Sequence, residues 1–365
     1  MDSFLTNLQA ITWQMPVMWV IGGILIYLAI KKDMEPTLLL PMGFGAILVN
    51  LPFSGANAVL ETLYNAGIAN ELFPLLLFIG IGAMIDFGPL LSNPSLLLIG
   101  AAAQFGIFFT LSLAALFGFD LKDAASIAII GAADGPTSIF VANYFHSKYI
   151  GAIMVAAYSY MALVPVVQPP VIKLLTTKQE RRIRMVYQQR SVSKITKILF
   201  PIAITVITGI VSPRSVALIG FLMFGNLIRE CGVLDSLSET AQKVLANLVT
   251  LFLGITIATK MQAQYFLTAE TLLILGLGLV AFVFDTAGGV IFAKILNLFL
   301  PKDSKINPMI GAAGISAFPM SARVVHKLGR AEDPQNFLLM PAVGVNVSGQ
   351  IASVIAGGLI LNLLG

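Results

Sequence analysis

Long uncharged apolar runs recur along the whole of this chain and limit it to very few folds. They reach the roughly 20 residues that a helix needs to cross the hydrocarbon core of a bilayer. Of the 365 residues, 57% are hydrophobic and only 11% are charged, about half the charged fraction of an ordinary soluble domain. The runs are rich in Leu, Ile, Ala, Gly and Phe and lack the short alternating pattern of barrel strands. We therefore expect an all-α integral membrane protein.

The apolar segments fall into two groups of six around a basic stretch, residues 173–197. That stretch contains Lys178, Arg181, Arg182, Arg184 and Arg190. We expect residues 1–172 and 198–365 to form two repeats, joined by this stretch as a cytoplasmic linker. The predicted segments are 16–30, 36–53, 72–90, 95–118, 123–145 and 150–172, then 196–211, 214–229, 244–262, 270–299, 305–325 and 336–363.

Two segments, 123–145 and 305–325, are poor in Leu and rich in Gly, Ala, Ser and Pro. Gly135-Pro136 interrupts the first, because proline removes a backbone donor and clashes with the preceding turn. Gly311 to Pro319 interrupts the second. We expect each to be a re-entrant hairpin that returns to its own side. Each half then has five spanning helices, the halves have opposite orientations, and both chain termini lie outside.

The basic residues agree with that orientation. It places all but four of the 22 lysines and arginines on the cytoplasmic side, as the positive-inside rule requires. The four exceptions are Lys122, Lys148, Arg214 and Lys260. If both hairpins were full spans, the basic loop after residue 330 would change sides relative to the linker.

The two halves also resemble each other in sequence, which predicts a duplication. With an odd number of spans per half, a duplication gives inverted repeats, whose ion sites lie near the midplane on broken helices. The matches keep the same order: Pro36–Gly43 with Pro213–Gly220, Asn50 with Asn226, Leu77–Gly80 with Leu251–Gly254, Ile130–Ala133 with Ile310–Ala313, and Met154–Tyr160 with Met340–Asn346.

Asp134 is the leading candidate for an ion ligand, because a carboxylate at membrane depth is costly and usually functional. Sodium is a hard cation that takes oxygen ligands, as calcium and magnesium do. The hydroxyls of Thr137 and Ser138 and carbonyls freed at Gly135-Pro136 could supply them. The alternative for Asp134 is a helix cap or a surface loop.

Other polar groups in apolar surroundings could add oxygen ligands. Asn346 and Ser348 lie in one polar run, where the alternative is helix packing. Asn307 and Ser316 flank the second hairpin. Asp285 is a further intramembrane acid, for which a kink that lines a cavity is the alternative.

Three residues could handle an organic substrate. Arg323 follows the second hairpin, and its guanidinium fork suits a carboxylate, although a basic residue anchored at the cytoplasmic surface explains it nearly as well. Tyr158 and Tyr160 carry hydroxyls that could deliver a proton; packing is the alternative. We also expect the helix that contains these tyrosines to end in a kink at Gln168-Pro-Pro170.

Several motifs resemble the β subunit of the sodium-pumping, biotin-dependent decarboxylases, which act on oxaloacetate, glutaconyl-CoA, methylmalonyl-CoA or malonate. The resemblance covers nearly the whole chain and departs at Asp285, where a small hydroxyl residue is expected. The motifs are Gly131-Ala-Ala-Asp-Gly-Pro-Thr-Ser-Ile-Phe140, Ala157-Tyr-Ser-Tyr-Met-Ala-Leu-Val-Pro165, Gly311-Ala-Ala-Gly-Ile-Ser-Ala317, Ala322-Arg-Val-Val325 and Asn346-Val-Ser-Gly349.

The resemblance implies an elevator-like pump in the plasma membrane that couples carboxybiotin decarboxylation to outward sodium transport. Its implied partners are a carboxyltransferase subunit, a biotin carrier protein and a small γ/δ-type membrane subunit, with the β chain as a homotrimer. When the family motifs are matched position by position, the resemblance implies that Asn346 lies in the ion-site motif. The residues that it implicates in coupling are Asp134, Tyr160, Asn307, Gly311, Ser316 and Arg323. Arg323 and Tyr160 would hold and protonate the carboxybiotin that the separate carrier presents.

Two other functions remain open on the residues alone. A sodium-coupled symporter of an organic anion would share the repeats and the midplane acid. A scaffold subunit that transports nothing would bind no sodium, and only the buried acid argues against it.

Overall fold

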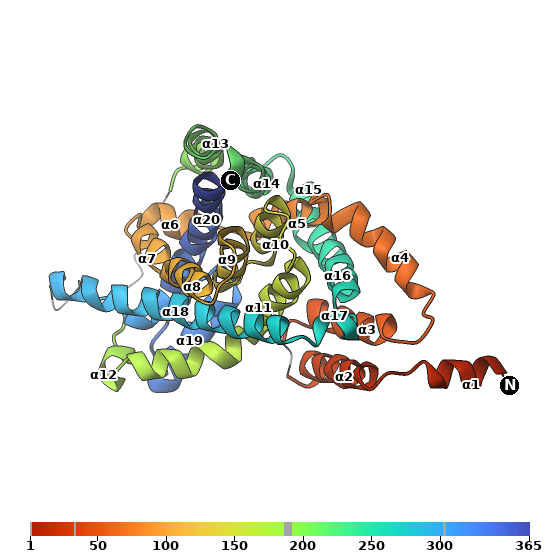
Figure 1. Cartoon of the computed structure of the whole chain (residues 1–365). Helices are drawn as coiled ribbons and strands as arrows, with labels where there is room; N and C mark the ends of the chain where they lie inside the picture. Colours follow the sequence, from red (N-terminus) through yellow and green to blue (C-terminus); the bar gives the residue numbers. More distant parts are fainter. Residues whose placement is uncertain (1, 33, 186–191, 302–303) are drawn as a thin grey trace.

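The computed structural model describes residues 2–32, 34–185, 192–301 and 304–365, and within them every regular element is helical (Figure 1). Arg190 and its neighbours at 186–191 in the predicted linker lie outside the described residues, as does Lys302, which we expected on the cytoplasmic side.

The elements of the first half are all helical and range from 4 to 26 residues in length. They are α1 (Asp2–Gln9), α2 (Gln14–Lys32), α3 (Pro36–Val49), α4 (Ala56–Leu63), a π-helical turn η1 (Tyr64–Ile68), α5 (Leu72–Met84), α6 (Gly88–Ser92), α7 (Leu96–Ala102), α8 (Phe105–Leu116), α9 (Leu121–Ala128), a 3₁₀ turn η2 (Ile129–Ala132), α10 (Gly135–Tyr144) and α11 (Ile150–Leu175).

The second half follows a similar order. Its elements are α12 (Lys178–Arg181), α13 (Lys194–Val211), the 3₁₀ turn η3 (Pro213–Ser215), α14 (Val216–Glu230), α15 (Asp235–Glu239), a π-helical turn η4 (Thr240–Leu245), α16 (Ala246–Ile257), η5 (Ala258–Lys260), α17 (Ala263–Phe266), α18 (Ala269–Phe299), a 3₁₀ segment η7 (Pro308–Gly314), α19 (Met320–Glu332) and α20 (Leu339–Leu364).

Several helices are long and apolar enough to cross a membrane, which confirms a multi-pass integral membrane protein. In the described ranges there are seven, or eight if the pair Ala56–Ile68 and Leu72–Met84, bent by 60°, is one span. The prediction of five spans and one hairpin per half is finer than this and stays a prediction. The seven are Gln14–Lys32, Leu96–Leu116, Ile150–Leu175, Lys194–Val211, Asp235–Lys260, Ala269–Phe299 and Leu339–Leu364.

Both predicted interruptions are present. In the first, η2 ends at Ala133, which has a left-handed backbone (φ 51°), and α10 begins at Gly135. Pro136 fits there because the first turn of a helix needs no donor from it. In the second, η7 ends at an extended Ile315 before α19 begins. We call η2 to Asp134 the first break and η7 to Pro319 the second break.

Helices of the two halves pack across each other in matching pairs. α3 packs on α16, and α14 packs on α5. The buried Asn50 amide donates to the Met261 carbonyl at 2.8 Å, and the buried Asn226 amide donates to the Ile85 carbonyl at 2.9 Å. Each asparagine thus satisfies the carboxyl end of a helix from the other half.

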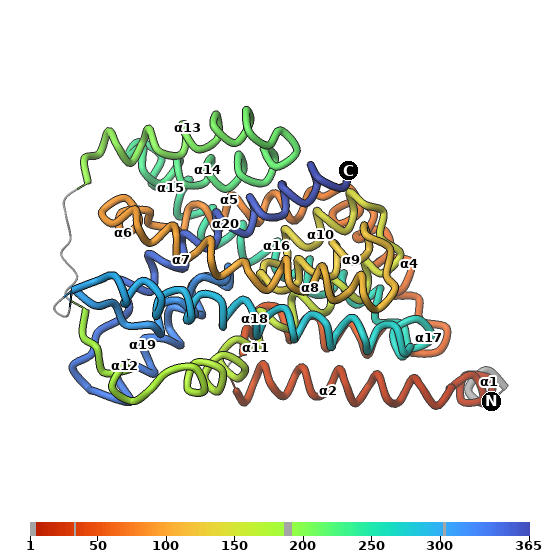
Figure 2. The backbone as a smooth tube through the Cα atoms, turned by 60° about the vertical axis from the view of Figure 1, so that its left-hand side comes forward, coloured from red at the N-terminus to blue at the C-terminus, as the bar shows by residue number. Residues whose placement is uncertain are grey.

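The first long helices of the two halves, α2 and α13, lie at opposite edges of the molecule with the other helices between them (Figures 1 and 2). Large apolar side chains on both are exposed, among them Ile24 and Ile30 on α2 and Ile207 and Ile210 on α13. Surface of this kind suits a lipid solvent and would be a liability in water.

Three local predictions were wrong. Residues 56–68 form α4 and η1, although their polar residues gave no apolar segment. α19 runs to Glu332, seven residues beyond the predicted end of its segment at 325. α11 continues through Pro169 and Pro170 to Leu175 instead of ending there.

Candidate functional site

Asp134 lies at the end of the first break, 3% exposed, as the N-cap of α10. Its Oδ2 accepts hydrogen bonds from the Thr137 hydroxyl at 2.7 Å, the Gln350 amide at 3.2 Å and the Ser353 hydroxyl at 3.2 Å. Its Oδ1 accepts from the Thr137 amide nitrogen at 3.4 Å. Among the residues described, no Lys, Arg or His is within ion-pair distance of this carboxylate.

Asp134 does cap α10, which is the alternative that the sequence left open. Capping alone does not explain why the carboxylate of Asp134 is buried. A cap at the protein surface needs no enclosure, whereas a buried carboxylate without a cation carries a large desolvation cost. The groups around it are hydroxyls and an amide, which can present oxygen to a small cation. The arrangement can hold a proton or a metal cation against Asp134.

Ser316 joins the second break to this carboxylate through one intermediate. Its hydroxyl donates to Ser353, whose own hydroxyl contacts Asp134. The Ser316 amide nitrogen also donates to the Ala132 carbonyl at 2.9 Å, so the two breaks are hydrogen-bonded to each other. The structure thus brings Asp134, Thr137 and Ser316 together, although Asp134 and Ser316 lie about 180 residues apart in the chain.

Three buried carboxamides from three different helices hold the second break. Gln168 donates to the Ala312 carbonyl at 2.7 Å, and Gln104 donates to the Gly314 carbonyl at 3.1 Å. Asn346 donates to the carbonyls of Ala313 and Ile315, at 3.1 and 2.7 Å. All four carbonyls from residue 312 to residue 315 are therefore occupied by amide donors, while the amide oxygens have no hydrogen-bond partner.

Two predicted ion ligands lie in other surroundings. The Ser348 hydroxyl bonds the carbonyls of Leu96 and Val345. Asn307 caps η7 and donates to the carbonyls of Arg181 and Ile183 at 2.9 Å each. In this structure both side chains fix backbone and neither contacts Asp134.

The start of the predicted linker is anchored to α19. Arg181 forms an ion pair with Glu332 at 2.7 Å, and Arg184 forms one with Asp333 at 2.6 Å. The hydrogen bond from Arg184 lowers the pKa of Asp333 below its usual value. Because Asn307 caps η7 and donates to the carbonyls of Arg181 and Ile183, it connects the second break to this anchored segment.

Tyr160 and Arg323 are held at separate places. The Tyr160 hydroxyl donates to the Leu275 carbonyl on α18. Arg323 is exposed and lines a cavity of about 440 Å³, together with Pro36, Pro165 and Lys327. Arg323 and Lys327 are one helical turn apart on α19, so they bring two positive charges to the cavity, which Glu35 also lines.

The predicted structural glycines lie where the backbone has no room for a side chain. A Cβ on Gly311 would lie 2.1 Å from the Gly289 carbonyl oxygen on α18, and one on Gly135 would meet the ring of Tyr158 at 2.3 Å. A Cβ on Gly131 would lie 2.6 Å from Oδ2 of Asp285. The hydroxyl of Tyr158 is buried and has no hydrogen-bond partner.

Gln350, Ser353, Gln104 and Gln168 are the site residues that sequence reasoning did not single out. Gln350 ends the polar run Gly344–Gln350 and lies one helical turn after Asn346. This spacing along α20 could have suggested it. Ser353 is an isolated serine in an apolar helix and gives no such signal. Gln104 had no signal beyond being an amide inside a predicted span.

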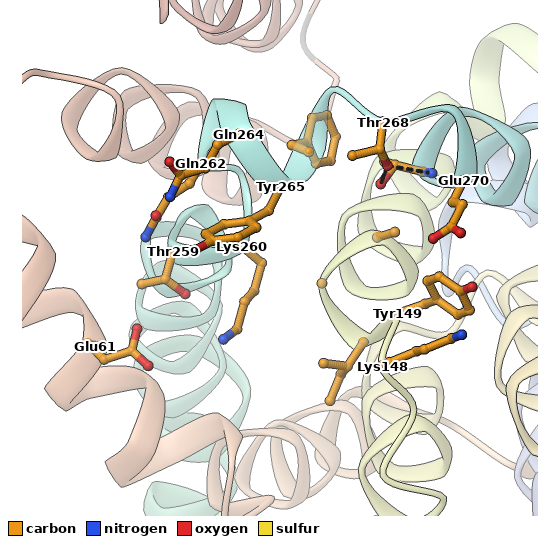
Figure 3. A pocket seen from close by; sticks show the side chains of 15 residues that line it. Glu61, Lys148, Tyr149, Thr259, Lys260, Gln262, Gln264, Tyr265, Thr268 and Glu270 are labelled. Atoms are coloured by element: carbon orange, nitrogen blue, oxygen red, sulfur yellow. Dashed lines mark hydrogen bonds between the residues drawn. The ribbon is translucent and has the colours of Figure 1, made fainter. Parts of the chain in front are cut away.

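A second cavity, of about 460 Å³, opens where the start of α11 faces η5, α17 and the start of α18. Figure 3 shows Glu61 and Lys260 on one side of it and Lys148, Tyr149 and Glu270 on the other. Lys148 and Lys260, two of the four basic residues that we expected outside, thus share one opening. Lys260 lies 4.0 Å from the ring centre of Tyr64, a cation–π contact.

Comparison with known proteins gives matches over nearly the full length. The family described as the Na+-transporting oxaloacetate decarboxylase beta subunit matches residues 14–364. The glutaconyl-CoA decarboxylase subunit beta of Acidaminococcus fermentans is 48% identical over 100% of both chains. The methylmalonyl-CoA decarboxylase subunit beta of Veillonella parvula is 50% identical over 95% of this chain and 92% of that one. The oxaloacetate decarboxylase beta chain of Klebsiella pneumoniae is 44% identical over 94% of each.

Proposed function

This chain belongs to the family of Na+-transporting oxaloacetate decarboxylase beta subunits, and we propose that it uses the decarboxylation of carboxybiotin to move sodium ions outward across the plasma membrane. It is a membrane subunit of a sodium-transporting decarboxylase. The family assignment does not favour the alternative, a sodium-coupled symporter of an organic anion. The acid that is decarboxylated follows from the partner subunits, since the relatives are named for different acids.

One observation carries the sodium site: a buried carboxylate at a helix break is surrounded by neutral oxygen-bearing side chains. Sodium bound at Asp134 would neutralise it, with Thr137, Ser353 and the Gln350 amide around it. Ser316 supports the site through Ser353, and Asn346 fixes the carbonyls of the second break. Each of these roles uses a contact that the fold already makes.

The cavity beside Arg323 is the proposed entry for carboxybiotin. A guanidinium binds a carboxylate through two parallel hydrogen bonds, and Lys327 adds charge one turn away. Decarboxylation of the carboxylated ring nitrogen releases CO₂ and leaves a nitrogen anion that takes up one proton. We assign proton delivery to Tyr160, whose hydroxyl must then leave the Leu275 carbonyl that it contacts here. The proposed partners are a carboxyltransferase subunit, the biotin carrier and a small γ/δ-type membrane subunit, in a homotrimer.

We further propose that residues 1–172 and 198–365 are inverted repeats, joined by the cytoplasmic linker 173–197, with both termini outside. Four paired features support this. Each half has a π-helical turn before its third long helix, a 3₁₀ segment at its break, an asparagine that caps a helix of the other half, and its first long helix at an opposite edge (Figure 2). An elevator-like displacement of the unit that contains both breaks would then expose Asp134 to either side.

Coupling requires that decarboxylation depends on bound sodium. Moving one charge outward against 100 mV costs about 2.3 kcal/mol. If decarboxylation proceeded with an empty site, its free energy would be lost as heat. Neutralisation of Asp134 by sodium provides the condition, because an uncompensated carboxylate resists movement through an apolar environment.

Asp134→Asn in the assembled complex tests the proposal. We expect sodium-dependent decarboxylation and sodium uptake into inverted membrane vesicles to be abolished. Asp120→Asn is the matched control, because Asp120 is also a helix N-cap but is exposed. Asparagine caps helices as well as aspartate does, so the control should retain both activities. Normal pumping by Asp134→Asn would overturn the proposal.

A further inference from the structure

Asp285 lies at the middle of the face that α18 turns toward the two breaks. Along this face, Gly278 packs against Ile130 beside the first break, and Gly289 packs against Gly311 in the second. Asp285 falls between them, seven residues after Gly278 and four before Gly289. These spacings place all three on one face of a helix. The carboxyl group therefore sits at the contact between α18 and both breaks.

The carboxyl group of Asp285 is fully buried, at 0% exposure, and only half satisfied. Its Oδ1 accepts a hydrogen bond from the Ile107 amide nitrogen at 3.1 Å, while its Oδ2 has no hydrogen-bond partner. No cation among the residues described is within ion-pair distance of it. An ionised carboxylate in this position would be uncompensated, which costs far more than protonating it.

Backbone closes over the carboxyl group of Asp285 at Gly131 and Gly106. A Cβ on Gly131 would lie 2.6 Å from Oδ2 and 2.7 Å from the Cβ of Ala281, and one on Gly106 would lie 2.6 Å from Oδ1. A methyl group does not fit at either glycine. A hard cation needs a shell of several oxygen ligands, and among the residues described no group of three or more Asp, Glu, His or Cys side chains is assembled around Asp285. A proton is the cation that this site can take.

We propose that Asp285 is a proton-binding site, separate from the sodium site, that is protonated while α18 is packed on the breaks. The reaction is the addition of one proton to Oδ2 of the carboxylate, with no other bond formed or broken. Because Gly106 and Gly131 close over the carboxyl group, its proton exchanges only when α18 separates from α8 or the first break. The protonation state of Asp285 therefore depends on whether α18 is packed on the breaks. It does not depend on which acid the assembled complex decarboxylates.

The elements around Asp285 bring few other titratable groups to it. In the described residues, α7, α8, η2 and η7 carry none. On α11, Tyr160 faces α18 at Gly278, on α9 Lys122 and Asp123 lie at the end away from the break, and Asp134 follows the first break. The infrared signal of Asp285 must therefore be distinguished from that of Asp134 and from little else within the membrane.

Infrared spectroscopy of the purified full chain in lipid tests the proposal without relying on decarboxylation. At neutral pH the wild type should show a protonated-carboxyl carbonyl band that Asp285→Asn removes. Asp134→Asn should retain this band and Asp285→Glu should shift it. If Asp285→Asn does not fold, the same band in Asp134→Asn, shifted by ¹³C-aspartate labelling and slow to respond to deuterium, serves instead.

Binding of ²²Na+ to the same preparations separates the proton from a metal ion. Asp285→Asn should bind as many sodium ions per chain as the wild type, whereas Asp134→Asn should bind fewer. Absence of any band that depends on Asp285, or loss of one bound sodium ion in Asp285→Asn, would overturn the proposal. Failure of the proposed pump function would leave the infrared band unchanged, and equal sodium binding by Asp134→Asn and the wild type would count against the sodium site alone, so the two proposals can fail independently.

Discussion

The contact between Gly289 on α18 and Gly311 in the second break predicts a severe and specific cost for one added methyl group. A Cβ on Gly311 would lie 2.1 Å from the Gly289 carbonyl oxygen, and ordinary contact begins near 3.4 Å. The two segments would have to separate by more than 1 Å. The obstacle is backbone, so no rotamer change can relieve it.

We expect Gly311→Ala to destabilise the chain by about 3 kcal/mol, the upper end of the usual cost of overpacking. At about 2 °C per kcal/mol for a chain of this size, the apparent melting temperature in detergent should fall by about 6 °C. Gly276→Ala, on α18 like Gly289, is the control. A Cβ there meets nothing within 4 Å, and alanine suits a helix better than glycine.

Gly289→Ala adds a methyl group to the same contact from the other side and should cost a similar amount. Once one methyl group has forced the two segments apart, the second methyl group adds little further strain. The double variant should therefore lose less stability than the sum of the two single losses. A melting temperature for Gly311→Ala within about 1 °C of wild type would refute the reasoning. Strictly additive losses would show that the two glycines do not share one contact.

Two further substitutions test contacts that the fold creates. Asn226→Ala leaves the Ile85 carbonyl buried without a donor and should lower the free energy of unfolding by about 1–3 kcal/mol. Asn70→Ala, which removes an exposed amide, is the control and should leave the melting temperature unchanged. Ser353→Ala removes a hydroxyl from the proposed sodium site and should raise the sodium concentration for half-maximal decarboxylation about tenfold or more, since hydrogen bonds to charged groups contribute about 1.5–3 kcal/mol. Ser112→Ala, an exposed serine bonded to its own helix, should have no effect; equal sodium constants for the two serine variants would contradict the site.

The parts of the site that were predictable are those that local chemistry determines. Asp134 and Thr137 are three residues apart at a glycine–proline break, so their contact follows from helix-capping geometry alone. The interruption itself follows from the missing donor of Pro136. The asparagine pair, Asn50 and Asn226, was found by internal sequence matching, and both amides donate to a carbonyl at the carboxyl end of a helix in the other half.

The parts that were missed depend on contacts between distant segments. Ser353 reaches Asp134 across 219 residues of sequence, and nothing in its own surroundings marks it. Gln104 and Gln168 become recognisable only when the carbonyls of the second break are seen to need donors. α4 was missed because its polar face lowers the hydropathy on which the search for segments relied. Asn307 is implicated in coupling by the resemblance alone. In the structure it contacts the linker at the carbonyls of Arg181 and Ile183.

The long helix α18 touches both breaks along one face, and this has a mechanical consequence. A rigid helix cannot slide against Gly131 without also sliding against Gly311, because α18 meets Gly131 through the side chains of Ala281 and Asp285 and meets Gly311 through the backbone of Gly289. The two breaks therefore share a single degree of freedom. In the proposed elevator-like displacement, the two breaks would therefore move as one unit, and one helix would keep the polar interior from opening to both sides of the membrane at once.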